Sequence, residues 1–165
     1  MGKLNHFDEA GNAVMVDVTQ KEITERIAVA SGQITMNEET YQVVKEGRAK
    51  KGDVLAVARV AGIMATKKTS DLIPMCHPLM LTKAAIEFEC EDSTCTISVI
   101  CTTKLAGRTG VEMEALMGAT TALLTIYDMC KAMDRAMTIG QVQLLEKVGG
   151  KSGHYIREKE KERLC

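Results

Sequence analysis

The sequence predicts an α+β protein of the ferredoxin-like (split βαβ) type, an antiparallel sheet with helices packed on one face. Period-two alternation of apolar and polar residues predicts strands at 24–34 and 84–91, and the second returns at once through 94–104 as a hairpin. Apolar helical segments lie on either side of this hairpin, and a last strand follows at 139–148. The order is strand, two helices, strand, strand, helix, strand. Two strand–helix crossovers around a central hairpin are typical of this class.

The first strand and the two helices after it have clear boundaries. The strand at 24–34 (TERIAVASGQI) places Arg26 on one of its two faces. A first helix is expected from Asn37, its N-cap, to about residue 50, because the two glutamates after Asn37 favour the positive end of the helix dipole. Asp53 caps a second helix over 54–68, which is apolar almost all round and is therefore expected to be buried.

Residues 71–81 (DLIPMCHPLML) contain both prolines of the chain. Proline fixes its own φ and disfavours the helical region for the residue before it. Pro74 and Pro78 are therefore expected to hold Met75, Cys76 and His77 in an extended, non-helical conformation. On these residues alone the segment fits two roles: a rigid connector whose histidine is satisfied by backbone groups, or a presented site.

The second half of the chain supplies the hairpin, a long helix and the last strand. Asp92-Ser93 forms the expected hairpin turn, and the turn at 107–110 (GRTG) leads into a helix over about 111–135. No internal repeat or long linker interrupts the chain, so one domain over 1–165 is expected. We expect a mobile arm at about 1–13 and a charged, solvated tail at about 156–165.

Composition excludes several classes of function. The chain has 21 basic and 22 acidic residues and only 3% aromatic residues, which argues against nucleic-acid and membrane partners bound through overall charge or stacking. None of the six cysteines stands in C-x-x-C spacing, so neither a structural zinc site nor a dithiol motif is expected. Free thiols, with no apolar signal core at the amino terminus, predict a cytoplasmic protein.

Three segments are candidates for chemistry, each with a structural alternative. Asp128 and Lys131 neighbour each other on a helix that is otherwise apolar there. If they are exposed, they form an ordinary ion pair. If they are buried, a second amine such as Lys51 would lower the lysine pKa, and the pair could exchange protons near pH 7. The stretch 107–119 (GRTGVEMEALMGA) offers either an anion site or glutamates that complement a helix dipole. GGKSG at 149–153 lacks the Walker spacing and is interpreted as a flexible loop.

Long strings across the chain resemble the cyclic pyranopterin monophosphate synthase family, the molybdenum cofactor biosynthesis protein C family. They are MVDVTQKEITER, KKGDVLAVARVAGIMATKKTSDLIPMCHPL, GVEMEALMGATTALLTIYDMCKAMD and the GGKSGH end. The resemblance implies a substrate, 3',8-cyclo-7,8-dihydro-GTP, that is converted to cyclic pyranopterin monophosphate with loss of pyrophosphate. It implies no redox cofactor, although Mg²⁺ could accompany the substrate phosphates.

The resemblance also implies roles for residues. Lys51 and Lys131 resemble the general acid/base amines, and Asp128 resembles the catalytic carboxylate beside them. Two segments resemble the substrate-binding residues, namely Met75, Cys76 and His77, and Glu112, Met113 and Glu114. Weaker correspondences, as contacts to the triphosphate, are Arg26, Lys67 and Arg108.

Helix geometry adds an expectation about assembly. Glu112 and Asp128 stand sixteen positions apart on one predicted helix, which is roughly 24 Å at about 1.5 Å per residue. One nucleotide-sized pocket cannot contact both, so a shared site requires at least a homodimer with the site at the subunit interface. The family resemblance further implies a hexamer built as a trimer of dimers.

Two other classes of function compete with the synthase. A non-catalytic nucleotide- or pterin-binding module would have the same fold, because fold does not fix function. A zinc hydrolase would use Cys76, His77 and His154, but the sequence offers no second ligand pair at a standard spacing. No metal site is therefore predicted.

Overall fold

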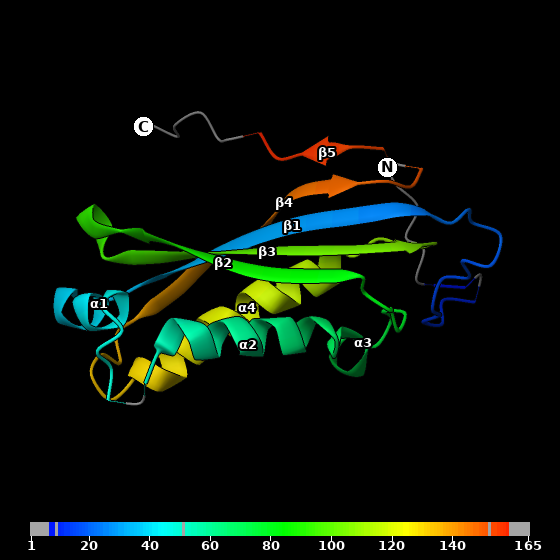
Figure 1. Ribbon diagram of the computed structural model, residues 1–165. Helices are drawn as coiled ribbons and strands as arrows, with labels where there is room; N and C mark the ends of the chain where they lie inside the picture. The colour runs from blue at the N-terminus through cyan, green and yellow to red at the C-terminus, as the bar shows by residue number, and fades with distance from the viewer. Residues whose placement is uncertain (1–6, 9, 51, 152, 159–165) are drawn as a thin grey trace, which may run out of the picture.

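Five antiparallel strands form one sheet in the computed structural model, which describes residues 7–8, 10–50, 52–151 and 153–158. Their order across the sheet is β2-β3-β1-β4-β5 (Figure 1). The strands are β1 (Thr24–Thr35), β2 (Lys83–Glu91), β3 (Thr96–Gly107), β4 (Thr138–Val148) and β5 (Tyr155–Ile156). With β1 central and β2–β3 a hairpin, the ferredoxin-like α+β prediction is confirmed.

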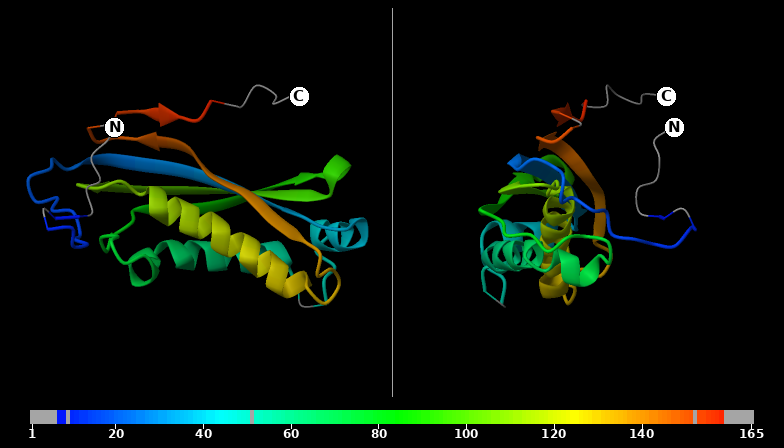
Figure 2. Two further views of the ribbon diagram at one scale, coloured as in Figure 1. Left: turned by 180° about the vertical axis from the view of Figure 1, so that it is seen from behind. Right: turned by 90° about the vertical axis from the view of Figure 1, so that its right-hand side faces the viewer.

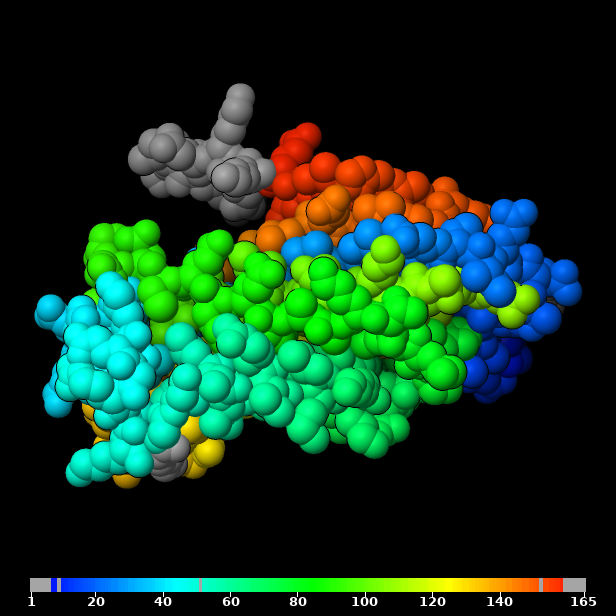
Figure 3. Space-filling view, viewed as in Figure 1, coloured from blue at the N-terminus to red at the C-terminus, as the bar shows by residue number. Residues whose placement is uncertain are grey.

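Two long helices cover one face of this sheet. The helices are α1 (Glu38–Lys45), α2 (Val54–Thr66), α3 (Thr69–Leu72) and α4 (Glu112–Cys130), with a 3-10 turn η1 (Asp92–Thr94) between β2 and β3. The end-on view in Figure 2 shows α2 and α4 together on one side of the strands. In the space-filling view, α2 and β2 lie side by side on the surface (Figure 3).

Alternation along the central strands places small apolar residues against the helices. Ala28 and Ala30 of β1 and Cys101 of β3 are fully buried, as are Ala119 and Leu123 of α4. Side chains this small let α4 approach the sheet closely, as expected for an interior packed at high density. The predicted faces of the first strand are confirmed, with Arg26 on the buried face.

Helix ends are where the prediction and the structure differ. Asn37 and Asp53 cap α1 and α2 as predicted, accepting from the backbone amides of Thr40 and Ala56. The first helix nevertheless ends at Lys45 and not near residue 50, because Gly47 adopts a φ of +65° that a right-handed helix does not allow.

The long helix is also shorter than predicted, since α4 ends at Cys130 and not near residue 135. Beyond it, the buried carboxylate of Asp134 accepts hydrogen bonds from the backbone amides of Asn37 and Ala136. These contacts draw the chain out of the helix and towards the start of α1. A local helical pattern does not reveal such a long-range bond.

The structure adds two short elements to those predicted. Residues Thr69–Leu72 form α3, so the beginning of the proline segment is helical. Tyr155–Ile156 pair with β4 as β5, where a solvated tail is predicted from about residue 156. Residues 1–6 and 9 of the predicted arm and 159–165 of the tail lie outside the described residues. No helix in the described ranges is long and apolar enough to cross a membrane.

Candidate active site

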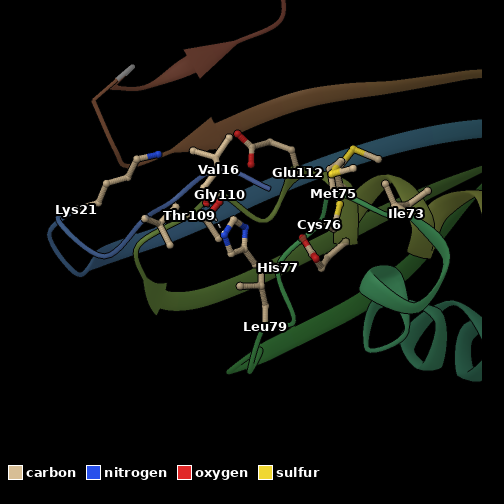
Figure 4. Close-up of a pocket in the computed structure, with 13 residues that line it drawn as sticks. Val16, Lys21, Ile73, Met75, Cys76, His77, Leu79, Thr109, Gly110 and Glu112 are labelled. Carbon is tan, nitrogen blue, oxygen red and sulfur yellow. Dashed lines mark hydrogen bonds between the residues drawn. The ribbon is translucent and has the colours of Figure 1, made fainter. Parts of the chain in front are cut away.

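A cavity of about 330 Å³ lies where the proline segment, the start of α4 and the residues before β1 meet (Figure 4). Its volume is within the roughly 300–1,000 Å³ range of small-molecule sites. It is lined by the apolar side chains of Val16, Val18, Ile73, Met75, Leu79 and Met113, by Gly110, and by the polar or titratable residues Lys21, Cys76, His77, Thr109, Glu112 and Glu114. We call this cavity the ring pocket.

The proline segment reaches the ring pocket through a turn. The amide of Cys76 donates to the carbonyl of Ile73 at 3.0 Å, which closes a turn over Pro74 and Met75. The chain from Cys76 onward has no regular structure before β2, so the predicted non-helical conformation of His77 is confirmed, whereas Met75 lies in the turn. All three predicted residues, Met75, Cys76 and His77, line the ring pocket.

His77 is fixed by the segment that precedes β1. Its Nε2 lies 2.8 Å from the carbonyl oxygen of Val16 and donates to it, because a carbonyl can only accept. The expected alternative, a histidine whose hydrogen bonds are satisfied by backbone groups, therefore holds for one of the two ring nitrogens. A neutral His77 with this tautomer keeps Nδ1 as a hydrogen-bond acceptor.

Glu112 forms an ion pair with a lysine that the sequence analysis does not single out. Lys147 Nζ lies 2.9 Å from Glu112 Oε1, with the two side chains only 22% and 27% exposed. The Glu112 carboxylate folds back over Gly110, where an added Cβ would lie 1.9 Å from Oε2. Glycine at position 110 therefore permits the observed place of this carboxylate.

Among the described titratable groups of the ring pocket, Glu114 is buried and Cys76 is half-buried. Glu114 is 3% exposed. Burial raises the pKa of its carboxyl and outweighs the hydrogen bond accepted from its own backbone amide, while the nearby Glu112 raises the pKa further. Burial, with an added contribution from Glu114, also raises the pKa of the Cys76 thiol, so this cysteine is not an activated nucleophile.

A second and larger hollow, of about 860 Å³, adjoins the ring pocket. Of the residues that the structure describes, five cationic ones line it, namely Lys21, Arg26, Arg108, Lys147 and Lys151, against one acidic residue, Glu22. We call it the cationic groove. Val16, Lys21, Thr109 and Gly110 line both hollows, so the ring pocket and the cationic groove are continuous.

Arginine–backbone hydrogen bonds organise the walls of the cationic groove. Arg26, only 7% exposed, donates from Nε to the carbonyl of Gly107 and from Nη2 to that of Arg108. Arg108 in turn donates from Nε to the carbonyl of Lys21 at 3.0 Å. Gly150, at φ +80°, packs so closely on Arg26 that a Cβ would lie 1.9 Å from Nη1. Gly150 and Lys151 therefore form part of one wall of the groove.

The structure places the predicted Asp128–Lys131 pair at the opposite end of α4 from the ring pocket. Lys131 Nζ donates to Asp128 Oδ1 at 2.8 Å, and the two side chains are 54% and 66% exposed. The hydrogen bond to Asp128 raises the pKa of Lys131, opposite to the direction that a neutral general base requires. Among the described residues of one chain, this pair lacks the burial that would lower the lysine pKa toward 7.

The two other predicted lysines are Lys51 and Lys67. Lys51 lies outside the described residues. Lys67 is the exposed C-cap of α2 and belongs to the lining of neither hollow.

No group of three or more His, Cys, Asp or Glu side chains is placed to hold a metal within the described ranges. His154 lies apart from Cys76 and His77, with its Nε2 at 2.7 Å from Glu146 Oε1.

Sequence reasoning missed Val16, Lys21 and Lys147. Lys147 reaches Glu112 because β4 pairs antiparallel with β1, opposite Ala28, and no local motif encodes that pairing. Lys21 precedes the first strand in a polar stretch without periodicity. One signal in the sequence could have indicated Lys21: it precedes Arg26 by five residues, at the end of the sheet where the first strand begins.

The continuous pocket and groove are typical of a protein that acts on or binds a small ligand with a ring system and several negative charges. A comparison with protein-family models identifies the family of this chain. The MoaC family model matches residues 15–150, and the chain belongs to the MoaC family.

Curated relatives carry one name. The chain is 60% identical over 156 residues to the cyclic pyranopterin monophosphate synthase of Clostridium botulinum (strain Alaska E43 / Type E3), covering 94% of this chain and 98% of that protein. It is 57% identical over 153 residues to the synthase of Clostridium perfringens (strain 13 / Type A), covering 93% and 97%. It is 56% identical over 158 residues to that of Heliobacterium modesticaldum, covering 96% and 99%.

Proposed function

We propose that this chain is a cyclic pyranopterin monophosphate synthase of molybdenum cofactor biosynthesis. The enzyme converts 3',8-cyclo-7,8-dihydro-GTP to cyclic pyranopterin monophosphate and releases pyrophosphate. The alternative of a non-catalytic binding module is not favoured, because the curated relatives are named as the synthase.

One observation carries the proposal beyond the family name: the ring pocket opens directly into the cationic groove. A nucleotide-derived substrate needs such a pair of sites side by side, one for a flat ring system and one for a triphosphate. The ring pocket supplies apolar walls with a few polar groups, and the groove supplies lysine and arginine side chains.

Residues of the ring pocket bind and orient the ring system. Met75 and Met113 contribute apolar contacts, while Cys76, His77, Glu112 and Glu114 supply the polar ones. Because His77 and Glu112 are held by Val16 and Lys147, little side-chain freedom is lost on binding.

The cationic groove binds the triphosphate and stabilises the leaving pyrophosphate. Arg108, Lys21 and Lys151 lie in its lining, and their fixed positive charge opposes the negative charge that gathers as the cyclic phosphate closes. Arg26 already donates to two carbonyls, so only its remaining N–H groups are open to a phosphate. Lys67, outside the groove, stays a prediction from the family resemblance.

Lys51, Asp128 and Lys131 carry the proton transfers. Rearranging a purine-derived ring into a pyranopterin requires proton transfers and ring openings without net redox change, which amines and a carboxylate can perform. No resident cofactor is needed for these steps, and Mg²⁺ would enter only with the substrate phosphates. The thiols and the pathway suit the cytoplasm.

The active site is completed by a second copy of the chain. Glu112 and Asp128 lie at opposite ends of α4, so one chain does not bring both to one substrate. Apolar side chains exposed on α2, including Val57, Val60 and Met64, offer a surface that another subunit can cover. Such an assembly, a hexamer by family resemblance, would desolvate the exposed Lys131 and move its pKa downward.

The proposal is tested by turnover of enzymatically generated 3',8-cyclo-7,8-dihydro-GTP, with pyrophosphate and the pterin product measured together. We expect stoichiometric formation of both products by the wild type. The Lys51→Ala variant should lose turnover while it stays folded, whereas the neighbouring Lys50→Ala should keep it. Tight binding by the wild type without either product would contradict the synthase assignment.

A further inference from the structure

Asp134 is a buried carboxylate that no proposed step of the reaction uses. It stands three residues after Lys131, in the connection between α4 and β4, and is only 8% exposed. Its Oδ2 accepts a hydrogen bond of 2.7 Å from the backbone amide of Asn37, and its Oδ1 accepts one of 2.8 Å from that of Ala136. Burying a carboxylate is costly unless donors of this kind replace the water that it loses.

The hydrogen bond from Asn37 joins two segments that lie 97 positions apart in the chain. Asn37 is the N-cap of α1, where the helix dipole favours a negative charge. Figures 1 and 2 show α1 and the end of α4 at the same end of the molecule. Asp134 therefore fastens the α4–β4 turn, residues 131–137, to the beginning of α1.

Further hydrogen bonds close the α4–β4 turn onto the end of α4. The phenol of Tyr127 donates to the carbonyl of Arg135 at 3.1 Å, and the amide of Asp134 donates to that of Cys130 at 3.1 Å. Lys131 lies between these contacts, and its own amide donates to the carbonyl of Tyr127 at 2.8 Å. The side chain of Lys131 is exposed, but its backbone is held from both sides.

We propose that Asp134 is a positioning residue for the proton-transfer pair. By fastening the α4–β4 turn to the N-cap of α1, it holds Asp128 and Lys131 where they reach a substrate bound in the ring pocket of another subunit. The inference rests on the proposed function for the role of this pair. Asp134 belongs to the lining of neither hollow, so it acts through Lys131 and is not itself a catalytic residue.

The expected effect on the reaction follows from the distance dependence of proton transfer. A displacement of about 1 Å, caused by a change remote from the chemistry, can lower a rate by about a hundredfold. Lys131 has a long side chain, so the position of its backbone decides which places its amine can reach. Loss of the Asp134 contacts should therefore slow the chemistry. It should leave substrate affinity largely unchanged, because the ring pocket lies at the other end of α4.

The first experiment compares Asp134 with another carboxylate that holds α1. Asp92 accepts hydrogen bonds from Tyr41 Oη and Lys45 Nζ, both at 2.6 Å, so it fastens α1 to the β2–β3 hairpin and not to α4. With 3',8-cyclo-7,8-dihydro-GTP, Asp134→Ala should lose about tenfold or more in single-turnover rate, with KM little changed. Asp92→Ala should keep the wild-type rate. A wild-type rate in folded Asp134→Ala would overturn the proposal.

The second experiment removes the Asn37 donor and leaves Asp134 in place. Asn37 has a φ of −68°, close to the value of about −65° that the proline ring imposes, so Asn37→Pro deletes the N–H group that Asp134 accepts. Asn37→Ala is the matched control, because it keeps this N–H and loses only the side-chain cap on the amide of Thr40. We expect Asn37→Pro to turn over about tenfold or more slowly than Asn37→Ala. Equal rates would contradict the proposal, also where Asp134→Ala does not fold.

Mixing of variants separates positioning from a general loss of stability. Asp134→Ala mixed with Glu112→Ala should recover as much activity as Lys131→Ala mixed with Glu112→Ala, because the two changes affect opposite ends of α4. Asp134→Ala mixed with Lys131→Ala should show no gain, because both changes affect the same end. Recovery in this last mixture would refute the proposal. A wild type that forms neither product would refute the synthase assignment, an outcome distinct from an active wild type whose rate Asp134→Ala does not change.

Discussion

At the scale of single residues, the Lys147–Glu112 pair decides where the first carboxylate of the ring pocket lies. The ion pair is largely shielded from solvent, so its charges interact more strongly than those of exposed pairs. Glu112 is recognisable from the sequence, but its partner is not, because Lys147 stands 35 positions further along the chain, on a different element.

Replacing Lys147 by methionine should weaken substrate binding by about tenfold or more, because a charge-assisted hydrogen bond is lost and the Glu112 carboxylate is released. Isothermal titration with the substrate in a Lys51→Ala background measures this. Lys104→Met is the matched control, since Lys104 pairs with Glu25 at 2.6 Å outside both hollows. An equal loss in the two variants would contradict the role of Lys147.

Gly110 is required by the carboxylate that folds over it. In Gly110→Ala, the new Cβ would overlap Glu112 Oε2, so the carboxylate must rotate away from Lys147. We expect a clear rise in KM, with unfolding free energy changed by less than about 1 kcal/mol because the displaced atoms end a flexible side chain. Gly140→Ala, with open space around its Cβ, should leave KM unchanged. Unchanged KM in Gly110→Ala would refute this account.

At the scale of elements, α2 and α4 approach each other through two glycines. A Cβ on Gly62 would lie 2.9 Å from the carbonyl of Gly118, and a Cβ on Gly118 would lie 2.6 Å from Cys101 Sγ and 2.8 Å from Thr66 Cγ2. The close crossing fixes how the start of α4, with Glu112 and Glu114, is presented to the proline segment.

Gly118→Ala should therefore destabilise the fold by about 1–3 kcal/mol, as overpacking of a core does. At an unconstrained helix position the same change would stabilise by about 1 kcal/mol through helix propensity. Denaturant unfolding followed by circular dichroism gives the sign. A stabilised Gly118→Ala variant would show that the helices do not meet tightly there.

Much of the fold could be predicted at this scale. Alternation in the strands and the caps Asn37 and Asp53 are local signals, and the structure confirms them. The ends of α1 and α4 are set by Gly47 and by the buried Asp134, and β5 forms only because β4 offers it an edge. These features depend on tertiary contacts or on a single backbone angle, which periodicity does not encode.

The same division holds for the candidate site. Motif strings predicted Cys76, His77, Glu112 and Glu114, and the structure brings them to one pocket. Lys21 and Lys147, which complete the pocket and the groove, come from segments far apart in the sequence that the sheet brings together. The burial of Glu114 and the pairing of Glu112 with Lys147 depend on tertiary contacts, which one sequence does not contain.

At the scale of the whole molecule, the account requires two chains for one active site. The ring pocket lies at the beginning of α4, whereas Asp128 and Lys131 lie at its end, about 24 Å away along the helix axis. The elongated arrangement of the helix layer is visible in Figure 2. A site shared between copies would explain why the two sets of proposed site residues lie at opposite ends of one helix.

Mixing two inactive variants tests this claim most directly. In mixed oligomers of Glu112→Ala and Lys131→Ala, some interfaces combine the intact ring pocket of one chain with the intact Lys131 of the other. If half of the dimers are mixed and one of their two sites is intact, about a quarter of the wild-type activity should return. His77→Ala mixed with Glu112→Ala should stay inactive, since both changes lie in the same pocket. No recovery for Glu112→Ala with Lys131→Ala, despite demonstrated subunit exchange, would contradict the shared site.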